Sequence, residues 1–147
     1  MYYNPVNVSS EEMEGLTYED LSNPKWKGRI AIRSSGNMYN QSLVSSLIAN
    51  NGISATEYWA RRFVGNFARK PEGNDRAQIM AVANGEADIA IANSYYIGLM
   101  LSGKKGEEQQ AAARKVELHF PGQDGRGAHI NVSGACLLYT SPSPRDK

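Results

Sequence analysis

The chain has 147 residues, a length that allows one domain with a hydrophobic core. Sixteen Lys and Arg residues against 15 Asp and Glu residues leave a formal net charge of +1, so charge gives no support to a nucleic-acid or anionic-membrane partner. Two His and one Cys argue against a Cys/His zinc site, and no apolar run is long enough to span a membrane.

The first elements expected in chain order are short helical turns, a strand and a long helix. Residues 10–28 carry helix-capping residues and end in a Pro-Lys-Trp-Lys-Gly loop. Residues 29–33, RIAIR, predict a brief apolar strand that stops at the polar turn 34–37, SSGN. The helix that follows has apolar residues at helical spacing and ends at Gly52, a residue type common at helix C-termini.

Two further helices are expected before the next strand. Ser54 and Glu57 match a capping box, and apolar residues follow at helical spacing. Asp75 is expected to cap the next helix and Gly85 to end it. The apolar residues of the first of these helices are Tyr58, Trp59, Phe63 and Val64.

The second half of the chain repeats the strand–turn–helix pattern. Residues 87–92, ADIAIA, predict a short strand, and Ser94 begins the helix after it. A polar helix is expected over 107–115, a strand over 116–120 and an extended segment over 129–135. This alternation predicts an α/β fold with a mainly parallel sheet flanked by helices. Ligands of such sheets bind at the carboxyl ends of the strands, so the two strand-to-helix turns are expected to be neighbours.

The last 12 residues, CLLYTSPSPRDK, differ in character from the rest of the chain. They show no helical or strand period and contain two Ser-Pro steps. The peptide LLYTSPSPRD also matches the translation of a widely used transposase sequencing adapter. We therefore expect the natural sequence to stop near Ala135 and residues 136–147 to be a translated adapter tail without ordered structure.

Tyr95 and Tyr96 stand side by side at the second strand-to-helix turn. In a strand their side chains would point to opposite faces, whereas in the first turn of a helix they are about 100° apart and both phenols can reach one point. Ser94 as the N-cap would place them in that first turn, where the helix dipole favours phenolate. Aromatic packing, a carbohydrate or aromatic platform, and metal coordination all remain open from these residues alone.

Tyr39 lies just after the first strand-to-helix turn. It fits an amphipathic helix position, but if both turns face one cleft its phenol can join those of Tyr95 and Tyr96. Three phenolic oxygens suit a hard, highly charged cation, because only a strong Lewis acid displaces protons from groups of pKa about 10. Ferric iron is the natural candidate.

The turn residues Ser35, Gly36 and Asn37 have two interpretations. They can form an anion cradle, in which Gly36 allows close approach of the backbone and the hydroxyls and amides donate hydrogen bonds. They can equally form an ordinary turn and helix cap.

Four other polar residues lie near the expected crevice or close to it in the sequence. Asp75 and Arg76 could reach it, although Asp75 is expected to act only as a cap. His119 is expected to be a hydrogen-bonded histidine of the core or its edge, while His129, beside glycines, could touch a ligand. The sequence contains no Ser/His/Asp set, paired catalytic carboxylates or Walker motif, so we expect no enzyme activity.

Three stretches of the chain carry a family resemblance: YEDLSNPKWKGRIAIRSSGNMYNQSL, ANGEADIAIANSYYIG and HFPGQDGRGAHINVSGA. Together they strongly resemble the ferric-ion-binding proteins of bacterial iron ABC importers, which are periplasmic solute-binding proteins also called bacterial transferrins. The likeness spans nearly all of residues 1–135. It implies a fold of two α/β lobes joined by crossing hinge strands, with Fe(III) held in the cleft between them.

The resemblance implies that the chain is an internal fragment covering mainly the second lobe. MYYNP and HINVSGA would be the hinge strands near its two ends, with the first lobe and the export signal outside it. It further implies a periplasmic location, a monomer that does not itself span the membrane, and an ABC permease of the inner membrane as partner. No nucleic-acid partner is expected.

The resemblance also assigns roles to individual residues. Tyr95 and Tyr96 match the adjacent tyrosine ligands of the family, and Tyr39 matches the additional tyrosine of a tyrosine-rich branch, some members of which bind carbonate or no synergistic anion.

In another branch of the family, the turn equivalent to Ser35, Gly36 and Asn37 contacts phosphate. Asn37 replaces a small residue of that branch, and Asp75 falls near its asparagine contact, so phosphate is not expected here.

Two rival functions remain from the sequence. One is a solute-binding protein of the same fold for an organic anion or a polyamine. The other is the ligand-sensing domain of a transcriptional regulator, which can share the two-lobe architecture. A helix-turn-helix encoded upstream would favour the regulator, and an export signal with a neighbouring permease gene would favour transport.

Overall fold

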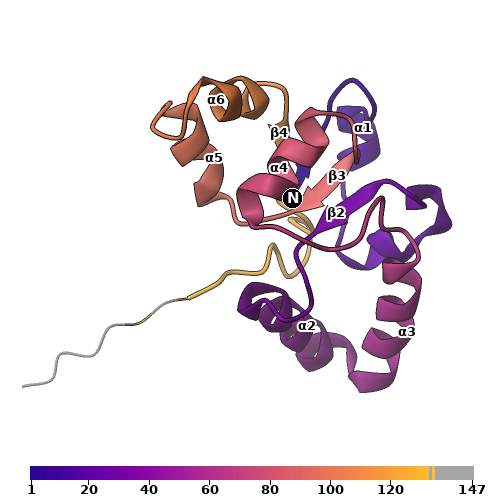
Figure 1. Cartoon of the computed structure of the whole chain (residues 1–147). Helices are drawn as coiled ribbons and strands as arrows, with labels where there is room; N and C mark the ends of the chain where they lie inside the picture. The colour runs from indigo at the N-terminus through magenta and orange to yellow at the C-terminus, as the bar shows by residue number, and fades with distance from the viewer. Residues whose placement is uncertain (133, 135–147) are drawn as a thin grey trace, which may run out of the picture.

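The computed structural model describes residues 1–132 and 134, with a small sheet at the centre and helices on both of its faces (Figure 1). The predicted boundary at Ala135 and the predicted adapter tail, 136–147, lie outside the described residues. The described part contains a four-stranded sheet in the order β2-β3-β1-β4.

The sheet combines one parallel pair with two antiparallel pairs. β2 (Ile30–Ile32) and β3 (Ile89–Ile91) pair in parallel, and β1 (Tyr2–Tyr3) lies between β3 and β4 (Glu117–Leu118), antiparallel to both. β2, β3 and β4 therefore share one direction. The predicted α/β class is confirmed, and β1 is the exception that makes the sheet mixed rather than purely parallel. β1 has only two residues and pairs with strands far along the chain, so the local pattern carries no information about its direction.

Side chains of successive strand residues enter two separate cores, as the pleat requires. Tyr3 and Ile30 belong to one cluster of buried residues, while Tyr2 and Ala31 belong to the other. The first cluster also contains Trp26, which is fully buried.

Helices cover both faces of the sheet (Figure 1). α2 (Met38–Asn51) and α3 (Ile53–Val64) contribute to the first cluster. α4 (Asp75–Ala83), α5 (Tyr95–Leu101) and α6 (Glu107–Ala113) contribute to the second. Helices α2 and α5 each follow a strand of the parallel pair, which is the strand–turn–helix pattern expected from the sequence.

The short helical turns predicted before β2 are present. They are α1 (Ser10–Met13) and the 3₁₀ helices η1 (Glu19–Ser22) and η2 (Pro24–Trp26). Ser9 caps α1 by accepting a hydrogen bond from the backbone N–H of Glu12, which confirms the capped-turn prediction.

Gly52 joins α2 directly to α3. Its φ of +82° ends α2, as predicted, and its backbone N–H donates to the Ile48 carbonyl at 2.8 Å. The predicted capping box of Ser54 and Glu57 is wrong. The helix already begins at Ile53, and its N-terminus has no side-chain cap. Gly52 is both the C-cap of α2 and the N-cap of α3, so no further residues lie between the two helices to cap α3.

Helix α4 is capped by Asn74, whose side chain accepts a hydrogen bond from the backbone N–H of Ala77 at 3.1 Å. The prediction that Asp75 is the cap is therefore wrong: Asp75 is the first helical residue, and its side chain is buried. Asn and Asp are both favoured at an N-cap, so only tertiary burial decides between these neighbours. Gly85 follows the helix with a φ of +78°, in agreement with the prediction that it ends α4.

The C-terminal part of the described chain is less regular than expected. Helix α6 begins at Glu107, as predicted, but the strand expected over 116–120 is reduced to the two residues of β4. Residues 128–132 lie outside regular secondary structure. Within the described ranges, none of the helices has the length and apolar character that crossing a bilayer requires.

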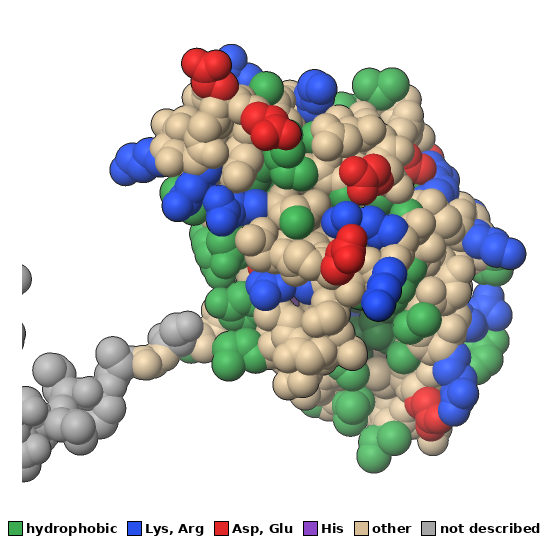
Figure 2. Space-filling model, viewed as in Figure 1, with side chains coloured by type: hydrophobic (Ala, Val, Ile, Leu, Met, Phe, Trp, Pro, Cys, Tyr) green, Lys and Arg blue, Asp and Glu red, His purple; other side chains and the backbone are tan. Residues whose placement is uncertain are grey.

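Charged side chains of both signs are interspersed over the face shown in Figure 2. This mixture agrees with the near balance of 16 basic and 15 acidic residues.

Replacement of Phe63 by Ala should destabilise the fold by about 3–5 kcal/mol, because it opens a cavity in the first core. Phe63 is 5% exposed and stacks on Trp59 with ring centroids 4.6 Å apart. The neighbouring Val64 is 58% exposed, so Val64→Ala should change the free energy of unfolding by less than about 0.5 kcal/mol. Denaturant titration of both variants measures the difference, and equal losses would contradict this packing.

Candidate metal centre

The parallel pairing of β2 and β3 brings their carboxyl ends, and the helices that follow them, to one edge of the sheet. Ile32 is opposite Ile91 in the register, and the chain continues from these residues to α2 and α5 respectively. Tyr39 in α2 and Tyr95 in α5 meet there: the Tyr95 hydroxyl donates to the Tyr39 hydroxyl at 3.3 Å. The predicted neighbourhood of the two turns is confirmed.

Tyr95 and Tyr96 lie in the first turn of α5, as predicted, with ring centroids 4.5 Å apart and planes inclined by 36°. Tyr95 is 56% exposed, whereas Tyr96 is half-buried and packs against the second core. Ser94 occupies the N-cap position, but its side chain makes no capping hydrogen bond. The pair thus combines an exposed phenol with one that the core holds in place.

The environment of Tyr95 favours its neutral form. Reduced solvation of the hydroxyl, together with hydrogen bonds to Tyr39 and Tyr96, raises the pKa of Tyr95 above the ordinary phenol value. The hydroxyls of all three tyrosines therefore belong to one interacting group. Only a strong Lewis acid can remove protons from such a group near neutral pH.

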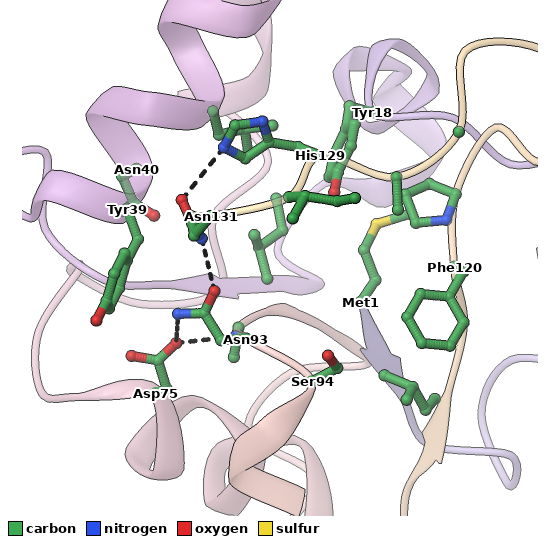
Figure 3. Close-up of a pocket in the computed structure, with 18 of the residues that line it drawn as sticks. Met1, Tyr18, Tyr39, Asn40, Asp75, Asn93, Ser94, Phe120, His129 and Asn131 are labelled. Carbon is green, nitrogen blue, oxygen red and sulfur yellow. Dashed lines mark hydrogen bonds between the residues drawn. The ribbon is translucent and has the colours of Figure 1, made fainter. Parts of the chain in front are cut away.

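Tyr39 and Tyr95 line a cavity of about 520 Å³ (Figure 3). Its wall mixes amide, charged and apolar side chains from both halves of the described chain. The polar members besides the tyrosines include Asn37, Asn40, Asp75, Asn93, Gln123, Arg126, His129 and Asn131.

A chain of hydrogen bonds crosses this cavity (Figure 3). Asn93 donates through its backbone N–H and its Nδ2 to Asp75 Oδ1, at 2.9 and 3.0 Å. Asn131 Nδ2 donates to Asn93 Oδ1 at 2.6 Å, and Asn131 Oδ1 lies 3.2 Å from His129 Nε2. The same His129 nitrogen is 3.0 Å from Ser42 Oγ.

Asn93 and Asn131 are cavity residues that the sequence pattern did not predict. Asn93 was detectable in principle, since it immediately precedes the Ser94 turn. No local sequence pattern predicts the position of Asn131, because its hydrogen-bond partner Asn93 lies on a distant segment of the chain.

Asp75 also contacts the first turn. Its Oδ2 accepts a hydrogen bond from the Arg33 guanidinium at 2.5 Å, and the side chains are 2% and 22% exposed respectively. The guanidinium carbon of Arg33 lies 5.9 Å from the centroid of the Tyr39 ring. The expectation that Asp75 is only a cap missed this buried ion pair, although the alternative that it reaches the crevice is correct.

The predicted anion-cradle residues do not share one location. Asn37 lines the tyrosine cavity, and its side chain caps α2 by accepting from the Tyr39 N–H at 3.1 Å. Ser35 and Gly36 are exposed on the turn, and Ser35 lines a separate apolar cavity beside α3. The structure therefore brings Asn37 to the tyrosines and leaves the other two outside the cavity lining.

His119 and Arg76, two further polar candidates from the sequence, do not line the tyrosine cavity. His119 is half-buried, and its Nε2 lies 3.3 Å from the Leu16 carbonyl, as expected for a hydrogen-bonded core-edge histidine; burial lowers its pKa. Arg76 contacts Gln109 in a different cavity. Over 1–132 and 134, His, Cys, Asp and Glu side chains form no cluster of three or more suited to a metal.

Comparison with known proteins gives close relatives. The chain is 52% identical to iron uptake protein A1 of Synechocystis sp. (strain ATCC 27184 / PCC 6803 / Kazusa), covering 96% of the chain and 38% of that protein. It is 46% identical to iron uptake protein A2 of the same organism, covering 97% of the chain and 41% of that protein. It is 30% identical to the Fe(3+)-binding periplasmic protein of Serratia marcescens, covering 95% of the chain and 38% of that protein. No protein-family model matches.

Solved structures agree with these sequence relatives. The Trichodesmium protein IdiA (FutA), in complex with iron and citrate ligands, is 56% identical with a TM-score of 0.81, over 86% of this chain and 39% of that one. The ferric binding protein from Campylobacter jejuni is 37% identical with a TM-score of 0.82, over 89% of this chain and 41% of that one. The chain spans about two fifths of the length of the relatives that it matches. Over nearly all of its length the chain is thus similar to iron uptake and Fe(3+)-binding periplasmic proteins, in agreement with the sequence resemblance.

Proposed function

We propose that residues 1–135 form the second lobe of a periplasmic solute-binding protein that carries Fe(III) to a bacterial iron ABC importer. In this proposal Tyr39, Tyr95 and Tyr96 bind the ion. The observation that supports it most directly is the 3.3 Å approach of the Tyr39 and Tyr95 hydroxyls, which come from two separate strand-to-helix turns. The names of the relatives, which refer to iron uptake and Fe(3+) binding, support the same cargo.

The donor set suits a hard trivalent cation. Three phenolates supply oxygen-only coordination, and their three negative charges balance the formal charge of Fe(III). This chain would then provide half of a coordination shell of about six positions. The other lobe, with carbonate or water, would complete the shell. Because this chain contributes one side of the cleft, we expect the full-length protein to bind iron more tightly than this chain alone.

Transport follows from closure of two lobes around the ion. Coordination by residues of both lobes favours the closed state, since only that state satisfies all ligands. An inner-membrane ABC permease would recognise the closed form and receive the cargo. The proposed protein acts in the periplasm, as the name of the Fe(3+)-binding periplasmic relative suggests. It is proposed to act as a monomer.

The anion that accompanies the iron is a separate proposal. Carbonate is proposed rather than phosphate, because Asn37 replaces a small residue of the phosphate-binding branch of the family and Asp75 falls near the asparagine contact of that branch. Ser35, Gly36 and Asn37 remain the proposed anion contacts, with Asn37 the member that lines the cavity. One solved relative contains citrate with its iron, so an organic carboxylate is a further candidate.

Addition of Fe(III) to the full-length protein should produce a visible tyrosinate-to-iron charge-transfer band. Tyr39→Phe, Tyr95→Phe and Tyr96→Phe should each weaken or shift that band, because each removes one phenolate donor. Absorption spectroscopy during ferric nitrilotriacetate titration measures it.

Tyr58→Phe is the matched control for this experiment. Tyr58 is 63% exposed on α3, away from the cavity lining, and its hydroxyl accepts a hydrogen bond from Arg62. Its replacement should leave the band unchanged. A band that is unchanged in the Tyr39, Tyr95 and Tyr96 variants, or no band at all, would eliminate the iron proposal. Binding of an organic anion or polyamine without a band would favour the rival solute-binding function.

Iron affinity should fall as the pH falls. Each phenol that coordinates the ion releases a proton, and the raised pKa of Tyr95 keeps that phenol neutral in the empty site near neutral pH. Lower pH therefore favours the protonated, iron-free state. Chelator competition across the neutral to mildly acidic range should show release of up to about three protons per ion, and Tyr39→Phe should reduce that number by about one. A pH-independent affinity would contradict phenolate coordination.

A further inference from the structure

We propose that Asp75 is the positioning residue of the tyrosine cluster: its single buried carboxylate connects both strand-to-helix turns and thereby sets the separation of Tyr39 and Tyr95. This inference rests on the proposed iron-binding function. Asp75 does not itself coordinate the ion in this proposal. It acts through the backbone and side chains that carry the ligands.

The first connection runs to the turn after β3. Asp75 Oδ1 accepts two hydrogen bonds from Asn93, one from the backbone N–H at 2.9 Å and one from the side chain at 3.0 Å. Asn93 lies two residues before Tyr95, so these bonds fix the start of α5. The Tyr2 hydroxyl holds the same turn from the other side, donating to the carbonyls of Asn93 and Ser94 at 3.0 and 3.1 Å.

The second connection runs to the turn after β2. Asp75 Oδ2 accepts from the Arg33 guanidinium at 2.5 Å, and that guanidinium lies over the Tyr39 ring. The Arg33 carbonyl accepts from Asn40 Nδ2 at 2.7 Å, which joins the turn to the first turn of α2 beside Tyr39. Arg33 thus contacts the Tyr39 ring through its side chain, and its backbone carbonyl is bonded to the first turn of α2, which carries Tyr39.

Burial makes these contacts hard to replace. Asp75 is 1% exposed, and a buried carboxylate without partners is strongly unfavourable. With so little of the Asp75 side chain exposed, water is a poor substitute for either turn, so a shift of one turn breaks a charge-assisted bond. Asn74 already caps α4, so helix capping does not require Asp75. Its role is in tertiary positioning.

Asp75→Asn in the full-length protein tests the inference. The amide retains an acceptor for the Asn93 N–H but lacks the charge that holds Arg33. The ferric charge-transfer band should shift or weaken, and iron affinity should fall about 10–100-fold, as is typical when groups that orient metal ligands are removed. Ferric nitrilotriacetate is the probe for both measurements.

Asp88→Asn is the matched control. Asp88 pairs with Arg29 at 2.5 Å and is 18% exposed, but these residues directly precede β3 and β2, at the opposite ends of the strands from the tyrosines. Loss of this pair should lower stability without changing the band or the affinity. Arg33→Gln should reproduce the effect of Asp75→Asn, and the double variant should lose little more than either single variant because the pair acts as one unit.

The outcomes separate this inference from the proposed function. A wild-type protein without a band refutes iron binding by the tyrosines. A wild-type band together with an unchanged band and affinity in folded Asp75→Asn overturns the positioning role and leaves the proposed function intact. If circular dichroism shows that Asp75→Asn does not fold, Asp75→Glu is the second variant to test. It keeps the charge and moves the carboxylate by one methylene. A wild-type band and affinity in Asp75→Glu would then overturn the positioning role.

Discussion

The parallel pairing of β2 with β3 is the constraint on which the candidate site depends. Ile30, Ala31 and Ile32 lie opposite Ile89, Ala90 and Ile91, so both strands deliver the chain to the same edge of the sheet. Two helices begin at that edge, and each presents tyrosine near its start. In an antiparallel pair the two exits would lie at opposite edges, and the same tyrosines would be separated by the length of the strands.

Stability and function make opposite demands on this edge. Among the three phenols, that of Tyr95 has a raised pKa because of partial desolvation and hydrogen bonding, so it favours its neutral form. Iron binding would require all of them to become anionic at short distance, which only a trivalent ion compensates. The surrounding wall is rich in amides and contains the buried Asp75–Arg33 pair, so it is polar and largely hydrogen-bonded before any cargo arrives. A preorganised polar site of this kind reorganises little on binding.

The tyrosine site is exposed at the surface of this chain, which agrees with the greater length of the known relatives. The relatives are about two and a half times as long as the matched segment, which covers 38% and 41% of the two Synechocystis proteins. Tyr95 is more than half exposed, and the tyrosine cavity contains apolar residues such as Phe120 and Ile130 that are 50% and 76% exposed. In the proposed two-lobe protein, this surface would meet the other lobe on closure.

Local sequence determined the α/β class, the helix ends at Gly52 and Gly85, and the position of the adjacent tyrosines in a first helical turn. These features depend on periodicity and backbone preference over a few residues. Tertiary structure alone decided the direction of β1, the choice of Asn74 over Asp75 as cap, and the hydrogen bonds from Asn131 through Asn93 to Asp75. These depend on burial and on contacts between residues far apart in the sequence, such as Asp75 with Asn93 and Tyr2 with Leu118, for which no local pattern exists.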